Sequence, residues 1–412
     1  MGSFLPWRSR FGLVGLVPLL ALLAATALPM PVAGRMDATV AARFLTADRP
    51  GLAATLQRVV DTARREFGLP GVSVAVRFPD GTTWTGVAGY ADVNGGVLVA
   101  PETPFALASI SKPFVAGVVM GLVEDGSLHL GDSVARLLPD VKLGSRSIDP
   151  RITVRELLDH TSGLRDHLTT SALDKAVTAA PTEHWSLARA LKYVGKPIAA
   201  PGVGFYYSNT NYVLLGLIVE RITGTPIATL LHERWIEPLG LTTATYQGVD
   251  APSSTPAIAY RFDSTIATAI PIDITDGTDV RPFTAITTAS GPAGSLMASA
   301  ADTAHWLEAL VTARVLAPET VARMVEDARR QTAILRGAPY GLGLQVYQVD
   351  GRRSLGHSGR LLGERGVARY FPDAGLTIVV LTNQSRTDPS IVLTRLLEKL
   401  LPWREPPGPP AS

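Results

Sequence analysis

Ser109 and Lys112 stand three residues apart, immediately before the apolar run from Pro113 to Val123. The run predicts a buried helix, and Pro113 fits its first turn. Ser109 is then expected at the helix N-terminus, where free N–H groups favour a developing negative charge. A serine becomes nucleophilic beside a base or cation, and a desolvated lysine can supply either. The alternative for so short a pattern is an N-capping serine beside a solvated lysine.

Tyr207 and Asn209 form a second candidate pair, just before the apolar segment from Tyr212 to Glu220. Side chains two residues apart on a loop can point the same way. The phenol could then relay a proton, and the amide could bind a substrate amide. The alternative is a surface aromatic residue beside a turn-forming asparagine.

The third candidate is the Gly-His-Ser-Gly-Arg segment 356–360. On an edge strand, alternation turns His357 and Gly359 the same way, and glycine permits close backbone approach to a ligand. The Arg360 N–H could then donate to an oxyanion opposite the Ser109 N–H. The alternative is a structural histidine in a glycine-rich turn.

Taken together, the three motifs resemble those of the serine β-lactamase and penicillin-binding family. They occur in the family's order and with family-like separations, as Ser109-Ile110-Ser111-Lys112, Tyr207-Ser208-Asn209 and His357-Ser358-Gly359. Segments 157–164, 294–299 and 340–343 are also similar to the family, so the likeness covers residues 50–400.

The Tyr-x-Asn form is similar to the branch with class C β-lactamases, D-alanyl-D-alanine carboxypeptidases, D-aminopeptidases and related esterases. That resemblance implies that Ser109 is acylated by substrate, that Lys112 and Tyr207 share proton transfer, and that Asn209 holds the acyl side chain. It also implies an oxyanion hole made by the Ser109 and Arg360 N–H groups. Because a free tyrosine has a pKa of about 10, a nearby lysine cation is needed to make its phenolate accessible.

Two residues depart from the β-lactamases of this branch. His357 stands where they usually carry lysine, and we expect its titration to change activity between about pH 5 and 8. A partly cationic histidine holds a β-lactam carboxylate less firmly, so efficient β-lactam hydrolysis is not expected. Arg360 stands where a small residue or threonine is expected. Its side chain either reaches a substrate carboxylate or pairs with Glu364 and faces solvent.

The sequence therefore predicts an acyl-enzyme serine hydrolase, in the first place a D-alanyl-D-alanine carboxypeptidase-like peptidase. An esterase, an amidase or a weak β-lactamase on the same residues is the alternative, and a non-catalytic cell-wall binding protein is another. The absence of a Gly-x-Ser-x-Gly motif disfavours a Ser-His-Asp α/β-hydrolase. The expected partner is a small-molecule or peptidoglycan-peptide substrate, with no obligate protein partner.

No metal and no cofactor are expected. Asp159-His160 and Asp166-His167 could mimic a metal pair, but they lack the short spacing of a metalloprotease helix, and His160 is expected to be structural. The 412 residues contain no cysteine, which excludes disulfides and thiolate chemistry. The net charge of +2 is too balanced for nucleic-acid binding. Lysine is scarce, so Lys112 is a distinctive residue.

The elements that must position these residues lie at both ends of the chain. Helical spacing over 52–67 is followed by a hairpin, 72–76 and 83–90, and two more strands are expected at 366–371 and 376–381 before a last amphipathic helix. The economical arrangement is α+β, an antiparallel sheet from both termini flanked by helices, with an inserted mainly helical domain. The hydrolase domain is expected at 50–402, its sheet part at 50–105 and 290–402 and its helical insertion at 106–289.

The N-terminus has the features of an export segment. Arg8 and Arg10 precede an uncharged stretch from Phe11 to Gly34, which predicts a signal peptide over 1–34, or an uncleaved membrane anchor. A linker over 35–49 and a Pro-rich tail over 403–412 complete the chain. We therefore expect a secreted, periplasmic or cell-envelope protein.

Overall fold

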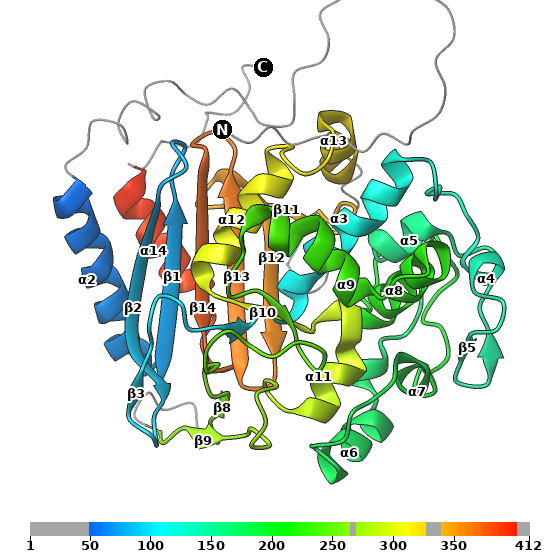
Figure 1. The fold of residues 1–412 in the computed structure, drawn as a ribbon, viewed down its shortest axis with the longest axis horizontal. Coiled ribbons are helices and arrows are strands. Elements are labelled where there is room, and N and C mark those ends of the chain that lie inside the picture. Colours follow the sequence, from blue (N-terminus) through cyan, green and yellow to red (C-terminus); the bar gives the residue numbers. More distant parts are fainter. Residues whose placement is uncertain (1–48, 264–268, 327–338, 402–412) are drawn as a thin grey trace, which may run out of the picture. The chain divides into compact units, whose positions relative to one another are not determined.

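The computed structural model describes residues 49–263, 269–326 and 339–401, and Figure 1 shows how their elements are arranged. The predicted signal or anchor segment 1–34 and the tail 403–412 lie outside the described residues. So does the predicted linker, except for Arg49, which begins the first described helix. The expected boundaries between a sheet part and a helical insertion stay predictions.

A seven-stranded antiparallel sheet takes its strands from both ends of the described chain (Figure 1). Its strands are β1 (Gly71–Arg77), β2 (Thr83–Asp92), β3 (Val97–Leu98), β11 (Gln345–Val349), β12 (Arg352–Leu361), β13 (Glu364–Phe371) and β14 (Leu376–Thr382). The order is β11-β12-β13-β14-β1-β2-β3, so the last strand of the chain pairs with the first. The predicted α+β fold, with an antiparallel sheet from both termini flanked by helices, is confirmed.

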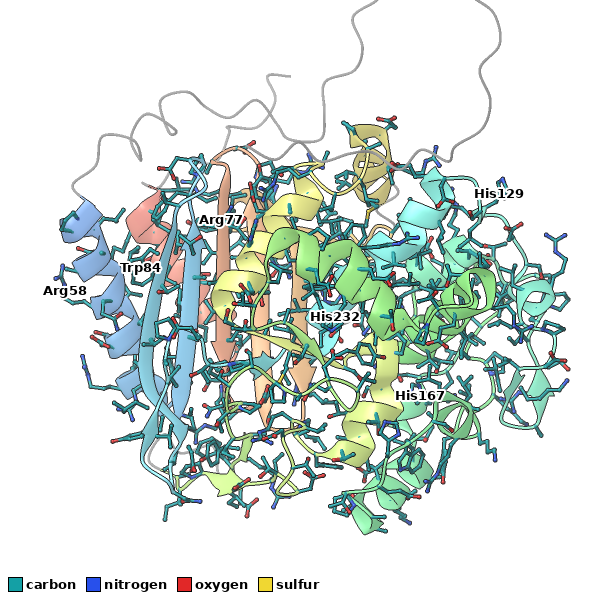
Figure 2. All side chains as sticks on the ribbon, in the orientation of Figure 1. Arg58, Arg77, Trp84, His129, His167 and His232 are labelled. Atoms are coloured by element: carbon teal, nitrogen blue, oxygen red, sulfur yellow. The ribbon has the colours of Figure 1, made fainter. Side chains whose placement is uncertain are left out.

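Strand β1 is buried between two layers of helices. Val72, Val74 and Val76 pack in one core with residues of α2 (Arg49–Phe67) and α14 (Ser390–Leu400). Ala75 points to the other face and belongs to the larger core, which contains much of α12 (Ala300–Val311). Arg58 lies on the exposed side of α2, away from the sheet (Figure 2). The amphipathic pattern of the first and last helices therefore predicts their packing on this sheet.

The middle of the chain is helical with short strands. Its elements before residue 200 are β4 (Phe105–Ala106), η1 (Ala108–Ile110), α3 (Ser111–Glu124), α4 (Val134–Leu137), β5 (Lys142–Leu143), β6 (Arg146–Ser147), α5 (Val154–Leu158), η2 (His167–Thr169), α6 (Ser171–Ala179) and α7 (Leu187–Leu191). The next are α8 (Asn209–Thr223), α9 (Ile227–Leu231), η3 (His232–Ile236), α10 (Glu237–Leu239), β7 (Thr245–Tyr246), β8 (Tyr260–Arg261), β9 (Ile272–Asp273), α11 (Thr284–Ser290), η4 (Gly291–Ala293) and β10 (Leu296–Ala298). Helix α13 (Pro318–Glu326) follows α12.

Helices α3 and α8 form the centre of the larger core and approach η4 closely. Phe114 of α3 stacks on Trp306 of α12, with ring centroids 4.4 Å apart. On α8, a Cβ at Gly216 would lie 2.4 Å from Pro292 of η4, so glycine is what allows this contact. The close packing brings the backbone of η4 next to the start of α3.

Among the described residues, no single helix is long and apolar enough to cross a membrane. Asn209–Thr223 and Ile227–Leu239 reach the required length and hydropathy only as a pair, and they are bent by 85° at the break between them.

Candidate active site

Ser109 lies in a tight turn that is held in a strained backbone conformation. The preceding residue, Ala108, has a φ of +47°, in the left-handed region that costs a non-glycine residue about 1–3 kcal/mol. Two hydrogen bonds to Leu296 fix this turn: Leu107 N donates to the Leu296 carbonyl oxygen over 2.9 Å, and Leu296 N donates to the Ser111 side-chain Oγ over 3.0 Å. The short sheet β4-β10-β7 therefore places Ser109 at the entrance to α3.

Lys112 is fully buried and donates three hydrogen bonds. Its Nζ lies 2.9 Å from Ser109 Oγ, 2.7 Å from Asn209 Oδ1 and 2.8 Å from the Ala293 carbonyl oxygen. The amide and carbonyl oxygens can only accept. When Lys112 loses a proton, its lone pair must therefore turn to Ser109, the partner with a hydrogen to donate. The geometry prepares Lys112 to accept the Ser109 proton.

The charge of Lys112 is set by two opposing effects. Burial lowers its pKa to about 7, because an ammonium ion loses its hydration in the core. The carboxylate of Asp166 acts in the opposite direction and stabilises the ammonium. Both protonation states are consequently populated near neutral pH, as a group that accepts and returns a proton requires.

Tyr207 presents its ring to Lys112 and its hydroxyl to Ser109. Lys112 Nζ lies 4.9 Å from the Tyr207 ring centroid. The phenol oxygen is buried and has no hydrogen-bond partner among the described residues. Burial raises the pKa of Tyr207 well above its ordinary value. This direction favours a neutral phenol over the accessible phenolate that is expected from the sequence.

Asn209, the first residue of α8, has both ends of its amide engaged. Its Oδ1 accepts from Lys112, and its Nδ2 donates to Asp166 Oδ2 over 2.7 Å. Asn209 thus links Lys112 to Asp166. The predicted contact between this amide and the acyl side chain of a substrate stays a prediction.

His357 lies on β12 with 1% of its surface exposed, and both ring nitrogens have partners. Nδ1 lies 2.6 Å from the Ser358 carbonyl oxygen, and Nε2 lies 3.0 Å from the Tyr340 hydroxyl. Because a carbonyl only accepts, Nδ1 carries the hydrogen, and Nε2 accepts from Tyr340. Burial, together with the nearby Lys112 charge, lowers the pKa of His357 well below its ordinary value. This direction favours a neutral imidazole over the titration between about pH 5 and 8 that is expected from the sequence.

Gly359 and Arg360 lie where β12 runs along η1. A Cβ at Gly359 would lie 2.2 Å from the Leu107 carbonyl oxygen, so only glycine permits this approach. Ser358 N donates to Gln345 Oε1, towards the β11 edge. Since N–H groups two residues apart on a strand point to the same edge, the Arg360 N–H points there as well. The oxyanion hole made by this N–H and the Ser109 N–H stays a prediction.

The Arg360 side chain is exposed to solvent. The alternative in which it pairs with Glu364 is wrong, because the Glu364 carboxyl is fully buried and no side chain among the described residues forms an ion pair with it. The other expected role, a contact with a substrate carboxylate, stays a prediction.

Asp166 and Tyr340 contact the candidate site residues, although the sequence reasoning missed both. Tyr340 was part of a family-like segment, but nothing local in the sequence linked it to His357. Asp166 was considered only as a metal ligand. Its neighbour His167 instead contacts Thr210 Oγ1 and the Ala289 carbonyl oxygen, beside α11 (Figure 2). No group of three or more possible metal ligands occurs among the described residues.

His160 forms the centre of an aromatic cluster behind Tyr207. It is fully buried, with a φ of +60°. Its ring centroid lies 4.2 Å from that of Tyr207 and 4.8 Å from that of Tyr340. The Ser208 N–H donates to its Nδ1 over 3.2 Å, which ties the cluster to the loop that carries Tyr207. The expectation of a structural His160 agrees with this packing.

A cavity of about 220 Å³ lies on the far side of this cluster. It is lined by Glu156, Asp159, Phe205 and neighbouring residues, and Ser109 is not among them. The Phe205 ring lies between this cavity and the cluster, 5.8 Å from the His160 ring centroid. The chemistry at Ser109 therefore does not take place in this cavity.

Three comparisons with known proteins agree with this geometry. The family model described as Beta-lactamase matches residues 56–401. Penicillin-binding protein 4 of Amycolatopsis lactamdurans is 28% identical over 79% of this chain and 84% of its own length. Protein flp of Staphylococcus aureus strain N315 is 25% identical over 80% of this chain, which spans only 62% of that protein.

Among solved structures, the chain is similar to a D-stereospecific amidohydrolase from Streptomyces sp., with a TM-score of 0.71 and 27% identity. That likeness covers 85% of this chain and 98% of the amidohydrolase.

Proposed function

This chain belongs to the Beta-lactamase family of serine hydrolases, and on that premise we propose that it hydrolyses amide bonds next to a D-amino acid through an acyl-enzyme on Ser109. The observation that carries the proposal is the position of Lys112. Two of its three hydrogen bonds end on oxygens that can only accept, so the deprotonated amine faces the Ser109 hydroxyl. A buried amine with a pKa of about 7 is a suitable base near neutral pH.

The reaction then has two halves. Lys112 takes the Ser109 proton, and Oγ bonds to the substrate carbonyl carbon while the Ser109 and Arg360 N–H groups hold the oxyanion. As the C–N bond breaks, the leaving nitrogen receives a proton from Lys112, with the neutral Tyr207 phenol donating a hydrogen bond beside it. Water next attacks the ester carbonyl carbon and gives a proton to the Lys112 amine. As the C–O bond to Ser109 breaks, Lys112 returns that proton to Ser109 Oγ, and the carboxylic acid leaves.

D-configured amides are the proposed substrate class. The similarity to a D-stereospecific amidohydrolase and to a penicillin-binding protein supports this class. The neutral state of His357 supports a substrate without a terminal carboxylate, because no cationic histidine is available to bind one. Amides and small esters of D-amino acids are therefore the first substrates to test.

D-alanyl-D-alanine carboxypeptidase activity is the second candidate, and the exposed guanidinium of Arg360 is the observation that favours it. Arg360 follows the strand residues nearest Ser109, and a planar guanidinium binds carboxylates bidentately. On this reading R360Q lowers turnover of a carboxylate-ended peptide and leaves turnover of a D-amino acid amide unchanged.

One substrate panel tests both candidates. The purified protein and S109A are incubated with D- and L-phenylalanine amide, an acyl-D-Ala-D-Ala peptide, a p-nitrophenyl ester and a labelled β-lactam. We expect turnover of the D-amide above the L-amide, and no turnover by S109A. Equal turnover of both enantiomers would contradict the D-amide proposal. No acylation by the β-lactam and no turnover of any substrate would favour the non-catalytic alternative.

Export is also a proposal, and it rests on the positively charged and apolar pattern of residues 1–34. Expression of the full chain followed by cell fractionation tests it. Recovery of the protein in the cytoplasm, with residues 1–34 intact, would contradict export.

A further inference from the structure

Asp166 holds the amide of Asn209 from the side opposite Lys112. The carboxylate is nearly buried, with 10% of the side chain exposed. Its Oδ2 accepts from Asn209 Nδ2 over 2.7 Å, and its Oδ1 accepts from Leu168 N over 2.9 Å, which caps η2. The two oxygens therefore serve two different groups.

The direction of the Asn209 amide follows from the chemistry of its neighbour. An ionised carboxylate only accepts hydrogen bonds, so Asp166 selects the NH₂ end of the amide. The carbonyl end, Oδ1, must then face Lys112, where it lies 2.7 Å from Nζ. Asp166 and Lys112 therefore hold the amide from its two ends, and without Asp166 only the Lys112 hydrogen bond fixes its direction.

We propose that Asp166 is a positioning residue for catalysis: it fixes the Asn209 amide so that its carbonyl oxygen holds the Lys112 amine against Ser109. This inference rests on the proposed acyl-enzyme function.

The charges around Lys112 give Asp166 a second, electrostatic effect. The titratable groups that face Lys112 are neutral near pH 7, because burial lowers the pKa of the histidines and raises the pKa of the tyrosines: His160, His167, His357, Tyr207 and Tyr212. The Asp166 carboxylate is the negative charge that stabilises the Lys112 ammonium. Removing this charge lowers the pKa of Lys112, so the amine is deprotonated at lower pH.

D166N separates positioning from a purely structural role. The new side chain has nearly the same shape, and its carbonyl oxygen still caps η2 by accepting from Leu168 N. Its NH₂ then faces Asn209, whose amide must turn its own NH₂ towards Lys112. The variant thus keeps the cap, loses the charge and reverses the amide. D174N is the matched control, because Asp174 is an exposed carboxylate on α6.

The experiment measures turnover against pH for wild type, D166N and D174N, and titrates the labelled Cε of Lys112 by NMR, assigned with K112R. We expect D166N to lower kcat by about 10- to 100-fold, as a misplaced catalytic group does, with KM changed less than about threefold. In D166N, the rising limb of turnover against pH and the titration of Lys112 both shift to lower pH. D174N matches wild type in turnover, pH profile and Lys112 titration.

The inference would be overturned if D166N changed only the melting temperature and left the Lys112 titration and kcat unchanged. Asp166 would then serve only to cap η2. The NMR titration needs no substrate. If wild type turns over none of the panel, the proposed function fails while the role of Asp166 towards Lys112 is still decided.

Discussion

Lys112 faces the ring of Tyr207, at 4.9 Å from its centroid, while the Tyr207 hydroxyl has no hydrogen-bond partner in the described protein. A buried hydroxyl without a partner costs about 1–3 kcal/mol of folding free energy. We therefore expect the Tyr207 hydroxyl to act on the substrate, because it is free to donate a hydrogen bond to it.

Y207F tests this view by separating stability from activity. Removing the unpartnered hydroxyl costs no hydrogen bond, so we expect a melting temperature equal to or above that of wild type. Turnover falls by about 10²-fold or more, because a proton donor beside the leaving group is lost. Calorimetry and steady-state kinetics measure the two effects. Loss of stability without loss of turnover would make Tyr207 a packing residue.

The pH dependence of turnover is expected to follow Lys112. Its pKa of about 7 means that the neutral, basic form is scarce below that pH and predominates above it. The value of kcat/KM should therefore rise with pH and level off, with a midpoint near 7. K112M, which cannot accept a proton, should lose activity at every pH. A rising limb centred well below pH 6 in the free enzyme would contradict this assignment.

H357Q is expected to leave that pH profile unchanged. The pKa of His357 is lowered well below 6.5, so the ring is already neutral throughout the range in which Lys112 titrates. H357Q is nevertheless expected to change how folding stability depends on pH. Below about pH 6.5, His357 binds a proton in the unfolded chain but not in the folded protein, so wild-type stability falls as the pH drops. H357Q should reduce this acid sensitivity. Loss of a kinetic ionisation between about pH 5 and 8 in H357Q would restore the prediction from sequence.

Glu364 is expected to lower stability at alkaline pH. Burial raises the pKa of its carboxyl well above the ordinary value, and the Arg281 charge only partly opposes this. Above about pH 4.5 the unfolded chain releases a proton that the folded state retains, so stability falls as pH rises, by up to about 1.4 kcal/mol per pH unit. E364Q removes this dependence.

The melting temperature of E364Q should therefore exceed that of wild type by more at about pH 8 than at about pH 5. E102Q, at an exposed glutamate, is the control and should follow wild type at both. A pH-independent difference for E364Q would show that the carboxyl is ionised in the folded protein.

Local patterns in the sequence predicted the parts of the site that depend on neighbours along the chain. Ser109 and Lys112 meet because they are three residues apart at the start of α3. The single antiparallel sheet also followed from the strand-like runs at both ends of the chain.

The charge states and the longer-range contacts could not be predicted in the same way. Asp166 reaches Asn209 across 43 residues of chain, and no local pattern indicates that contact. His357 is neutral because it is buried and bonded to Tyr340, two facts that depend on how β12 packs. Reference pKa values apply to solvated groups, so they misled the sequence interpretation wherever burial dominates.

Acylation of Ser109 is the central claim, and intact-mass spectrometry with peptide mapping tests it directly. Wild type, S109A and S171A are quenched in acid during reaction with a D-amino acid ester or a β-lactam. S171A is the control, because Ser171 is an exposed serine at the start of α6. We predict one acyl group on Ser109 in wild type and S171A, none in S109A, and a fall in S109A turnover of at least about 10⁴-fold. An adduct on another residue, or turnover by S109A at the wild-type rate, would contradict the account.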